Sequence, residues 1–413
     1  MRLPFLTTVL VGALSLSAMA GGLPKRVPVP VDVVKGNSAF ADDLLREFRK
    51  KNWSGNLVFS PLSISTACGM LYGGARGQTA AEIRRALHFP EDPKRTHAAY
   101  RQLAASLNIR TKTCQLRTAN AMFPQKGYGI RPGYLASLKT NYQAGAWELD
   151  FAQDPAGASK AINGWIERQT GNRIRNMISP DLLDADTRFV LVNAVYFKSD
   201  WASPFSVDRT RPESFHPLAA AAFQTSMMHQ TAEFGYLENR LVQVVELPYA
   251  GWRHSMILLL PKARDGLPEL EKRFVDSTTG VNLDNLRPRQ VRLSLPRFEV
   301  DGETMDLVPT LGALGMRRVF TRRAAELGGI SGEPELFVQS VLHKAWIRVD
   351  EAGTEAAAAT AMEGAMGGAE PELPKPIVFR ADHPFLFVLR DRRTGAILFL
   401  GRLARPSRAA PRP

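Results

Sequence analysis

The sequence predicts an α+β fold formed by one large unit. Helical patterns fill the first half of the chain and strand patterns the second, without the strand–helix alternation of a parallel sheet and without an internal repeat. A length of 413 residues suits two or three domains, but a single large unit can also reach it. The hydrophobic fraction of 45% and the charged fraction of 23% are typical of globular proteins.

The first 34 residues differ from the rest of the chain. Arg2 gives a positive start, residues 3–16 are mostly apolar, and an Ala-Met-Ala cleavage site precedes Gly21, so residues 1–20 are predicted to be a signal peptide. No later apolar run approaches the ~20 residues that a membrane helix needs. We therefore expect an exported protein, secreted or periplasmic and not bound to a membrane, that starts with a flexible arm at residues 21–34.

Apolar residues at helical spacing predict the helices. After Asn37, a predicted N-cap, Phe40, Leu44 and Phe48 share one face. The sequence Thr79-Ala-Ala-Glu is a capping box, which predicts a helix that begins at Thr79. The other predicted helices are one that opens at Pro61 and the segments Pro93–Leu107, Arg131–Tyr142, Pro155–Thr170 and Met305–Leu314.

Strand patterns dominate after Arg188. The stretch Phe189–Phe197 is apolar on both faces, as expected for a strand buried in the middle of a sheet. The turn Asp-Arg-Arg-Thr-Gly at 391–395 joins two closing strands as a hairpin. The other predicted strands are Leu116–Met122, Leu241–Pro248, Ser255–Leu260, Arg289–Val300, Leu336–Val349, Pro384–Arg390 and Ala396–Leu403.

The chain has two cysteines and a net charge of +13, which bear on disulfide formation and on the binding of polyanions. Cys68 and Cys114 are predicted to be free thiols, because two cysteines are not a disulfide framework and Cys68 lies in an apolar helical pattern. The charge makes polyanion binding an alternative, but arginine is spread through the whole chain and no nucleic acid is expected. The densest basic segments, 46–51, 287–292 and 402–412, are short. The predicted helix at 93–107 carries only Lys94, Arg95 and Arg101.

Motifs of enzymes are missing from the sequence. It has no Gly-x-Ser-x-Gly elbow, no phosphate-binding Gly-x-x-x-x-Gly-Lys loop and no His-Glu-x-x-His. The seven histidines include no helical pair at metal-ligand spacing. We therefore expect no enzyme, no metal and no cofactor.

One long segment between two strand patterns stands out, from Asp350 to Pro376. Its first half, rich in alanine and glutamate, has a local preference for helix. Its second half contains Gly364, Gly367, Gly368 and three prolines, which predict an exposed loop. Loops of this length in a compact chain are usually functional.

Four motifs in order resemble the serpin family. They are NLVFSPLSI at 56–64, NAVYFK at 193–198, EAGTEAAAAT at 351–360 and FRADHPFLF at 379–387, the last followed by FLGR at 399–402. The resemblance covers about residues 33–406. It implies a single domain at 35–406 with a dominant central sheet, two smaller sheets and about nine helices. It also implies an exposed reactive-centre loop at 351–376. Residues 407–413, beyond the domain, are expected to be a basic tail.

The resemblance assigns roles to two further groups. The first, the shutter, holds two central strands together where they must later part, and consists of Ser60, Ser63, Asn193 and His343. The second, the breach, lies where the loop enters the sheet. There Glu351 is expected to form a salt bridge with Arg297 close to Trp201.

The start of the loop resembles the hinge of an inhibitory serpin. Thr354, Ala356, Ala358 and Thr360 would share one face if this segment became a strand, and none is charged. A charged residue at Thr354 would instead be buried without a partner. The hinge consists of Glu351, Gly353, Thr354, Glu355, Ala356, Ala357, Ala358, Ala359 and Thr360.

The function implied is suicide-substrate inhibition of serine proteases, with cysteine proteases as a second class. The protease acylates at the loop and is trapped when the loop inserts from Thr354 as a strand, which could carry it roughly 50 Å. Family loop lengths place the scissile bond at Gly367–Gly368 or, one residue earlier, at Met366–Gly367. Met366 would suit an elastase- or chymotrypsin-like protease.

A second reading of the same resemblance is a non-inhibitory serpin that acts as a binding or chaperone-like protein. Such members typically carry a bulky or charged residue in the hinge, and this hinge has none. Either protein would act as a monomer without a cofactor.

Overall fold

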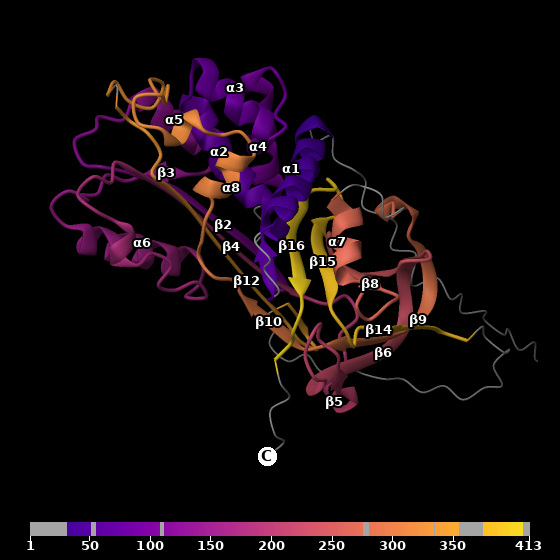
Figure 1. Cartoon of the computed structure of the whole chain (residues 1–413). Helices are drawn as coiled ribbons and strands as arrows, with labels where there is room; N and C mark the ends of the chain where they lie inside the picture. Colours follow the sequence, from indigo (N-terminus) through magenta and orange to yellow (C-terminus); the bar gives the residue numbers. More distant parts are fainter. Residues whose placement is uncertain are drawn as a thin grey trace, which may run out of the picture.

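The computed structural model describes residues 31–50, 55–107, 111–275, 281–333, 335–354 and 375–407. Within these ranges the chain forms eight α-helices and two β-sheets, which confirms the predicted α+β class (Figure 1). None of the described helices is long and apolar enough to cross a membrane.

The helices come mainly before the strands in the chain, as predicted. They are α1 (Val31–Lys50), α2 (Pro61–Gly74), α3 (Gly77–Ala86), α4 (Pro93–Leu107), α5 (Pro132–Tyr142), α6 (Pro155–Gln169), α7 (Leu267–Val275) and α8 (Val308–Ala313). Short 3-10 turns are η1 (Pro180–Leu182), η2 (Val207–Arg209), η3 (Leu283–Asn285) and η4 (Arg318–Phe320). Helices α2 to α5 gather at one end of the molecule, whereas α6 lies apart from them (Figure 1).

A seven-stranded sheet carries the loop segment. Its order is β10 (Phe298–Asp301), β12 (Ser340–Val349), β13 (Gly353–Thr354), β4 (Phe189–Asp200), β2 (Cys114–Pro124) and β3 (Gly145–Ala146), with β11 (Met305–Asp306) beside β12. Strands β4 and β12 run parallel and also pair with each other directly.

A nine-stranded sheet forms the rest of the β structure. Its order is β1 (Leu57–Phe59), β16 (Ile397–Leu403), β15 (Phe385–Asp391), β8 (His254–Pro261), β7 (Val242–Pro248), β6 (Phe223–Glu238), β9 (Arg287–Pro296) and β14 (Ile377–Arg380), with β5 (Arg211–Phe215) on β6. Two smaller sheets were expected beside the central one. In the described part of the chain they are continuous, because the 16-residue β6 pairs with β5, β7 and β9.

Strand β4 is buried on both faces, as its apolar pattern predicted. Alternate side chains point to opposite faces of a strand. Leu191, Val195 and Phe197 therefore join the main core with α2 and the nine-stranded sheet, whereas Val192 and Tyr196 join a second core beneath α6. The loop segment thus meets a sheet that is covered on both sides.

Helix α1 begins at Val31, six residues before the predicted N-cap. Asn37 is not a cap but an interior residue, 1% exposed, whose amide donates to the carbonyl of Ile397 at 3.2 Å. Val33 is also buried and extends the apolar face by one turn. Residues 31–34, assigned from the sequence to the flexible arm, therefore belong to the helix.

Helix α3 begins at Gly77, so the predicted start at Thr79 is wrong. The capping-box partner of Thr79 is Glu326, which accepts from the Thr79 amide at 3.1 Å and donates its own amide to the Thr79 hydroxyl at 3.0 Å. Glu82 instead accepts from the amides of Arg317 and Arg318. Glu326, from a segment distant in the chain, thus forms the reciprocal hydrogen bonds with Thr79 that the local motif predicted for Glu82.

The segment predicted as one strand at 289–300 is two strands in different sheets. Strand β9 ends at Pro296 and β10 starts at Phe298, and Arg297 between them turns toward the loop segment. Similarly, the helix predicted at 305–314 is shorter, because Met305 and Asp306 pair with β12 before α8 begins.

Both cysteines are free, as predicted, and both are buried. Burial raises the pKa of the Cys68 thiol to about 12, so this group is an unreactive part of the core.

Candidate functional site

The candidate site is the place where the loop segment enters the central sheet. Thr354 pairs with Ser199 of β4 on one side and with Val349 of β12 on the other. Further along, β12 and β4 pair directly over seven positions, from Trp346 opposite Tyr196 down to the strand starts. Strand β13 is therefore a two-residue wedge between strands that are otherwise joined to each other.

Close packing fixes both residues of the wedge. Thr354 is fully buried, and its hydroxyl lies 2.6 Å from that of Tyr249. At Gly353 a Cβ atom would lie 2.1 Å from the carbonyl oxygen of Ser199, so no other residue fits without a shift of β4. Glycine is required here by this close approach as well as by backbone freedom.

The structure brings Glu351 and Arg297 together. The Arg297 Nε donates to the two carboxylate oxygens of Glu351 at 2.6 and 2.7 Å, and the Thr210 hydroxyl donates to the same carboxylate at 2.5 Å. The Glu351 residue is only 5% exposed. A buried carboxylate needs such partners, because an unpaired one would be strongly destabilising.

Trp201 anchors the same segment from the other side. Its indole nitrogen donates to the carbonyl of Asp350 at 3.0 Å, and its backbone amide donates to the carbonyl of Ala352 at 2.8 Å. The ring stacks on Tyr249 with the centroids 4.4 Å apart. Residues 350–354 are thus held in place up to the point where the wedge ends.

The four shutter residues lie together, fully buried, where β4, β12 and the start of α2 meet. His343 Nδ1 lies 2.5 Å from Oδ1 of Asn193, and His343 Nε2 accepts from the Ser60 amide at 3.1 Å. The Asn193 amide group donates to the carbonyl and hydroxyl of Ser63 at 2.8 and 2.5 Å. Because Nε2 and the Asn193 oxygen are both acceptors, the neutral ring of His343 carries its proton on Nδ1.

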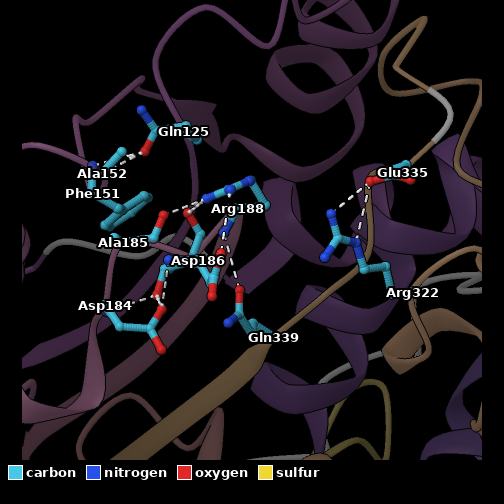
Figure 2. A network of polar contacts seen from close by, with 11 residues as sticks. Gln125, Phe151, Ala152, Asp184, Ala185, Asp186, Arg188, Arg322, Glu335 and Gln339 are labelled. Atoms are coloured by element: carbon cyan, nitrogen blue, oxygen red, sulfur yellow. Dashed lines mark hydrogen bonds and ion pairs between the residues drawn. The ribbon is translucent and has the colours of Figure 1, made fainter.

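A second set of contacts joins the two strands at their starts. The Arg188 amide donates to Oε1 of Gln339 at 3.0 Å, and Gln125 in turn accepts from two amides of the neighbouring loop, those of Phe151 and Ala152 (Figure 2). The Arg188 guanidinium donates to the carbonyl of Ala185 at 2.6 Å. Side-chain contacts therefore hold β4 and β12 together at two places: at the shutter in the middle of the strands and at Arg188 and Gln339 before their starts.

The remaining loop residues singled out from the sequence lie outside the described ranges. These are Glu355, Ala356, Ala357, Ala358, Ala359 and Thr360 of the hinge and Met366, Gly367 and Gly368 at the scissile bond.

Three residues of the site were not found from the sequence. Tyr249 contacts Thr354 across 105 positions, Thr210 contacts Glu351 across 141, and the side-chain Oδ1 of Asn120 accepts from the side-chain Nδ2 of Asn193 at 2.5 Å across 73. No local pattern marks such residues, because their partners are distant in the chain. For Tyr249, the one local signal is its position directly after the strand predicted at Leu241–Pro248.

A serine, a histidine and a glutamate lie together elsewhere in the described part of the chain. His229 Nδ1 lies 3.0 Å from the Ser294 hydroxyl, and its Nε2 lies 3.0 Å from Glu213. The serine is buried, and Glu213 also pairs with Arg380 at 2.6 Å. These contacts join β5, β6, β9 and β14 and present no exposed nucleophile.

Part of the basic charge is neutralised within the chain. Lys50 pairs with Glu47 at 2.5 Å, and Arg95 pairs with Asp32 at 2.5 Å. Arg402, which the sequence placed in a basic run, is 6% exposed and pairs with Glu271 at 3.0 Å. In the described ranges no group of three His, Cys, Asp or Glu residues could hold a metal ion.

Comparison with known proteins gives one family. The model of the serpin (serine protease inhibitor) family matches residues 35–406. An uncharacterized serpin-like protein of Thermococcus kodakarensis is 41% identical over 375 residues, covering 91% of this chain and 86% of the relative. The leukocyte elastase inhibitor of Bos taurus is 38% identical, covering 90% of this chain and 98% of the relative.

Solved structures give the same result. A highly specific serpin of the insect Tenebrio molitor has a TM-score of 0.82 at 31% identity and covers 91% of this chain and 98% of its own. Human thyroxine-binding globulin, solved with its ligand, has a TM-score of 0.79 at 28% identity, with 91% of this chain and 100% of that chain covered.

The shutter predicts a dependence of stability on pH. Burial lowers the pKa of His343 from 6.5 to about 3. Between these values the unfolded chain binds a proton that the folded chain does not. The contribution of His343 to the free energy of unfolding is therefore complete above pH ~6.5. Below that pH it falls by about 1.4 kcal/mol for each pH unit.

We expect urea unfolding between pH 7.5 and 4.5 to show a steeper loss of stability in the wild type than in His343→Gln. The control His216→Gln, which changes a partly exposed histidine outside the shutter, should keep the wild-type slope. Equal slopes in the wild type and His343→Gln would show that His343 does not stay neutral in the folded protein.

Proposed function

The chain belongs to the serpin family, and we propose that it inhibits serine proteases as a suicide substrate. The observation that carries this proposal is the state of the central sheet. Strands β4 and β12 pair directly over seven positions, and among the described residues Gly353 and Thr354 lie between their ends. Beyond these two residues, β4 and β12 pair with each other, whereas at their ends they are already separated. A loop that is to insert between the two strands requires this arrangement.

In the proposed reaction the protease serine attacks the backbone carbonyl of Met366 or Gly367. The peptide bond breaks, the new amino terminus leaves, and the acyl group stays on the protease as an ester. The freed loop then lengthens β13, drawing the acylated protease along the sheet. Water would hydrolyse the ester and release cleaved inhibitor if insertion were slow.

The register of β13 determines where each inserted residue would lie. If the pairing of Thr354 with Ser199 and Val349 continues, Thr360 comes opposite Asn193 and His343. Glu363 comes opposite the last directly paired residues of β4 and β12. The insertion would thus replace the shutter contacts midway and end about 30 Å from Thr354, at ~3.3 Å for each residue.

The chemistry of the inserting face supports this register. Thr354 faces the main core, so Ala356, Ala358 and Thr360 would follow it on that face. These side chains are small and uncharged, so they enter the core without the cost of burying an unpaired charge. At Thr360 a hydroxyl would arrive between two side chains that had lost their mutual hydrogen bond.

The proposed targets are elastase- or chymotrypsin-like serine proteases, with cysteine proteases as a second class. Met366 is an unbranched apolar side chain that such a pocket accepts. The relative from Bos taurus is a leukocyte elastase inhibitor by name, which agrees with this choice. The protein would meet these proteases after export, as the sequence of residues 1–20 predicts.

The alternative is a serpin that binds a ligand without trapping proteases. Thyroxine-binding globulin, by name a binding protein, has the same fold. The small residues of the hinge favour the inhibitor, because a binding protein has no need for a segment that can be buried in a sheet.

The experiment that tests the proposal is incubation with trypsin, elastase and chymotrypsin followed by denaturing gel electrophoresis. We expect a covalent complex that survives SDS with at least the elastase- or chymotrypsin-like enzyme. Clean cleavage in the loop by every protease, without any complex, would exclude the inhibitor and favour the alternative.

Thr354→Arg should convert the inhibitor into a substrate. Thr354 is buried against Tyr249, and an arginine there must be buried without a carboxylate partner or block the entry of the loop. Insertion would slow, while attack on the exposed bond would not. The ratio of complex to cleaved chain should fall strongly in Thr354→Arg and little in Thr354→Ser, and an unchanged ratio in Thr354→Arg would refute the assigned hinge.

A further inference from the structure

An aromatic pair lies directly beyond the wedge. Trp346 of β12 and Tyr196 of β4 are the first residues of the two strands that pair with each other after Thr354 has separated Val349 from Ser199. Their rings stack with the centroids 6.4 Å apart and the planes at 26°. Both belong to the second core beneath α6, with 5% of Trp346 and 6% of Tyr196 exposed. A longer wedge would therefore have to separate these two rings first.

Two further side chains hold the Trp346 ring. Its indole nitrogen donates to Oε1 of Glu299 in β10 at 3.0 Å, and the guanidinium carbon of Arg173 lies 5.7 Å from the ring centroid. A cation over the face of a tryptophan ring is attracted by the electrons of that face. The ring is thus held by β10 and by the connection between α6 and β4, as well as by Tyr196.

The connection that carries Arg173 is fixed to the helix before it. Ile174 is fully buried, and its amide donates to the hydroxyl of Thr170 at 3.2 Å. Further along, Asn163 of α6 exchanges two hydrogen bonds with the backbone of Ile178, at 2.8 and 2.9 Å. Arg173 therefore reaches the ring from a segment anchored on α6, which does not move with either strand.

The next two positions toward the shutter offer weaker side-chain contacts between the strands. They pair Ala345 with Val195 and Lys344 with Ala194. The ammonium group of Lys344 lies 3.2 Å from Asp301 on the other side of β12. A stacked aromatic pair contributes more than its buried area alone, whereas a small side chain opposite a lysine does not. Between the wedge and the shutter, the rings thus resist separation most strongly.

We propose that Tyr196, Trp346 and Arg173 form a latch that keeps the sheet closed at the end of the wedge and limits the rate at which a further strand enters. The proposal rests on the proposed function, because it takes the central sheet to be one that opens for the loop. None of the three residues would contact the protease or the scissile bond, so the latch acts on insertion alone.

Strand entry can be measured without a protease, as the rate at which a fluorescently labelled peptide with the sequence of residues 355–363 binds to the intact full chain. We expect binding to be several-fold faster in Arg173→Ala and about tenfold faster in Trp346→Leu. Arg173 is exposed, so its replacement leaves the core intact.

Two matched variants should keep the wild-type rate. Arg175→Ala removes an exposed arginine from the same connection, and Tyr196→Phe keeps the ring that stacks on Trp346. A third control, Phe215→Leu, changes a fully buried residue of the nine-stranded sheet, outside the latch. It should lower the urea midpoint and leave the rate of peptide binding unchanged.

Wild-type rates in both Arg173→Ala and Trp346→Leu would overturn the latch, and so would an equal acceleration in Phe215→Leu. Failure of every chain to bind the peptide would overturn it too. The protease gel tests the proposed function separately. Faster binding in the latch variants, without a covalent complex on the gel, would support the latch and count against the inhibitor, whereas a complex with unchanged binding rates would do the opposite.

Discussion

The hydrogen bond between His343 of β12 and Asn193 of β4 joins the two halves of the central sheet. Both residues also contact the start of α2, so a buried polar cluster fixes the sheet to the helices at the same point. Every polar atom described in this cluster has a partner with which it can hydrogen-bond, as burial requires. The neutral state of the histidine is a consequence, because burial favours it.

Some contacts hold β4 and β12 together, and others separate them. The shutter and the Arg188–Gln339 contact hold β4 and β12 together at the middle and at the far end. The wedge of Gly353 and Thr354 separates them at the other end, supported by Trp201, Tyr249 and the Arg297–Glu351 pair. Each residue added to the wedge would gain ladder hydrogen bonds worth about 1 kcal/mol net each and would break one position of direct pairing. If the proposed function holds, the closed sheet persists only as long as the loop is intact.

Much of this could be predicted from the sequence, because the signals are local or belong to long motifs. The apolar pattern of Phe189–Phe197 predicted the buried strand, and the resemblance predicted which residues meet at the shutter and the breach. Contacts between distant segments could not be predicted. Thr79 is capped by Glu326 rather than by Glu82, and Asn37 lies inside a helix because Ile397 supplies an acceptor. The contact of Tyr249 with Thr354 could not be predicted for the same reason, since the two residues are 105 positions apart.

The measurement that tests the central claim most directly is a thermal melt before and after cleavage of the loop between residues 363 and 369, with the site of the cut confirmed by mass. If the closed sheet is a metastable state, the cut lets the hinge insert and adds on the order of 10 kcal/mol in hydrogen bonds and buried methyl groups. The cleaved protein should then melt tens of degrees higher, well beyond the few degrees that about 1 kcal/mol gives in a large domain. A cleaved protein that melts at or below the temperature of the intact one would contradict the account, since cutting an ordinary exposed loop only loosens it.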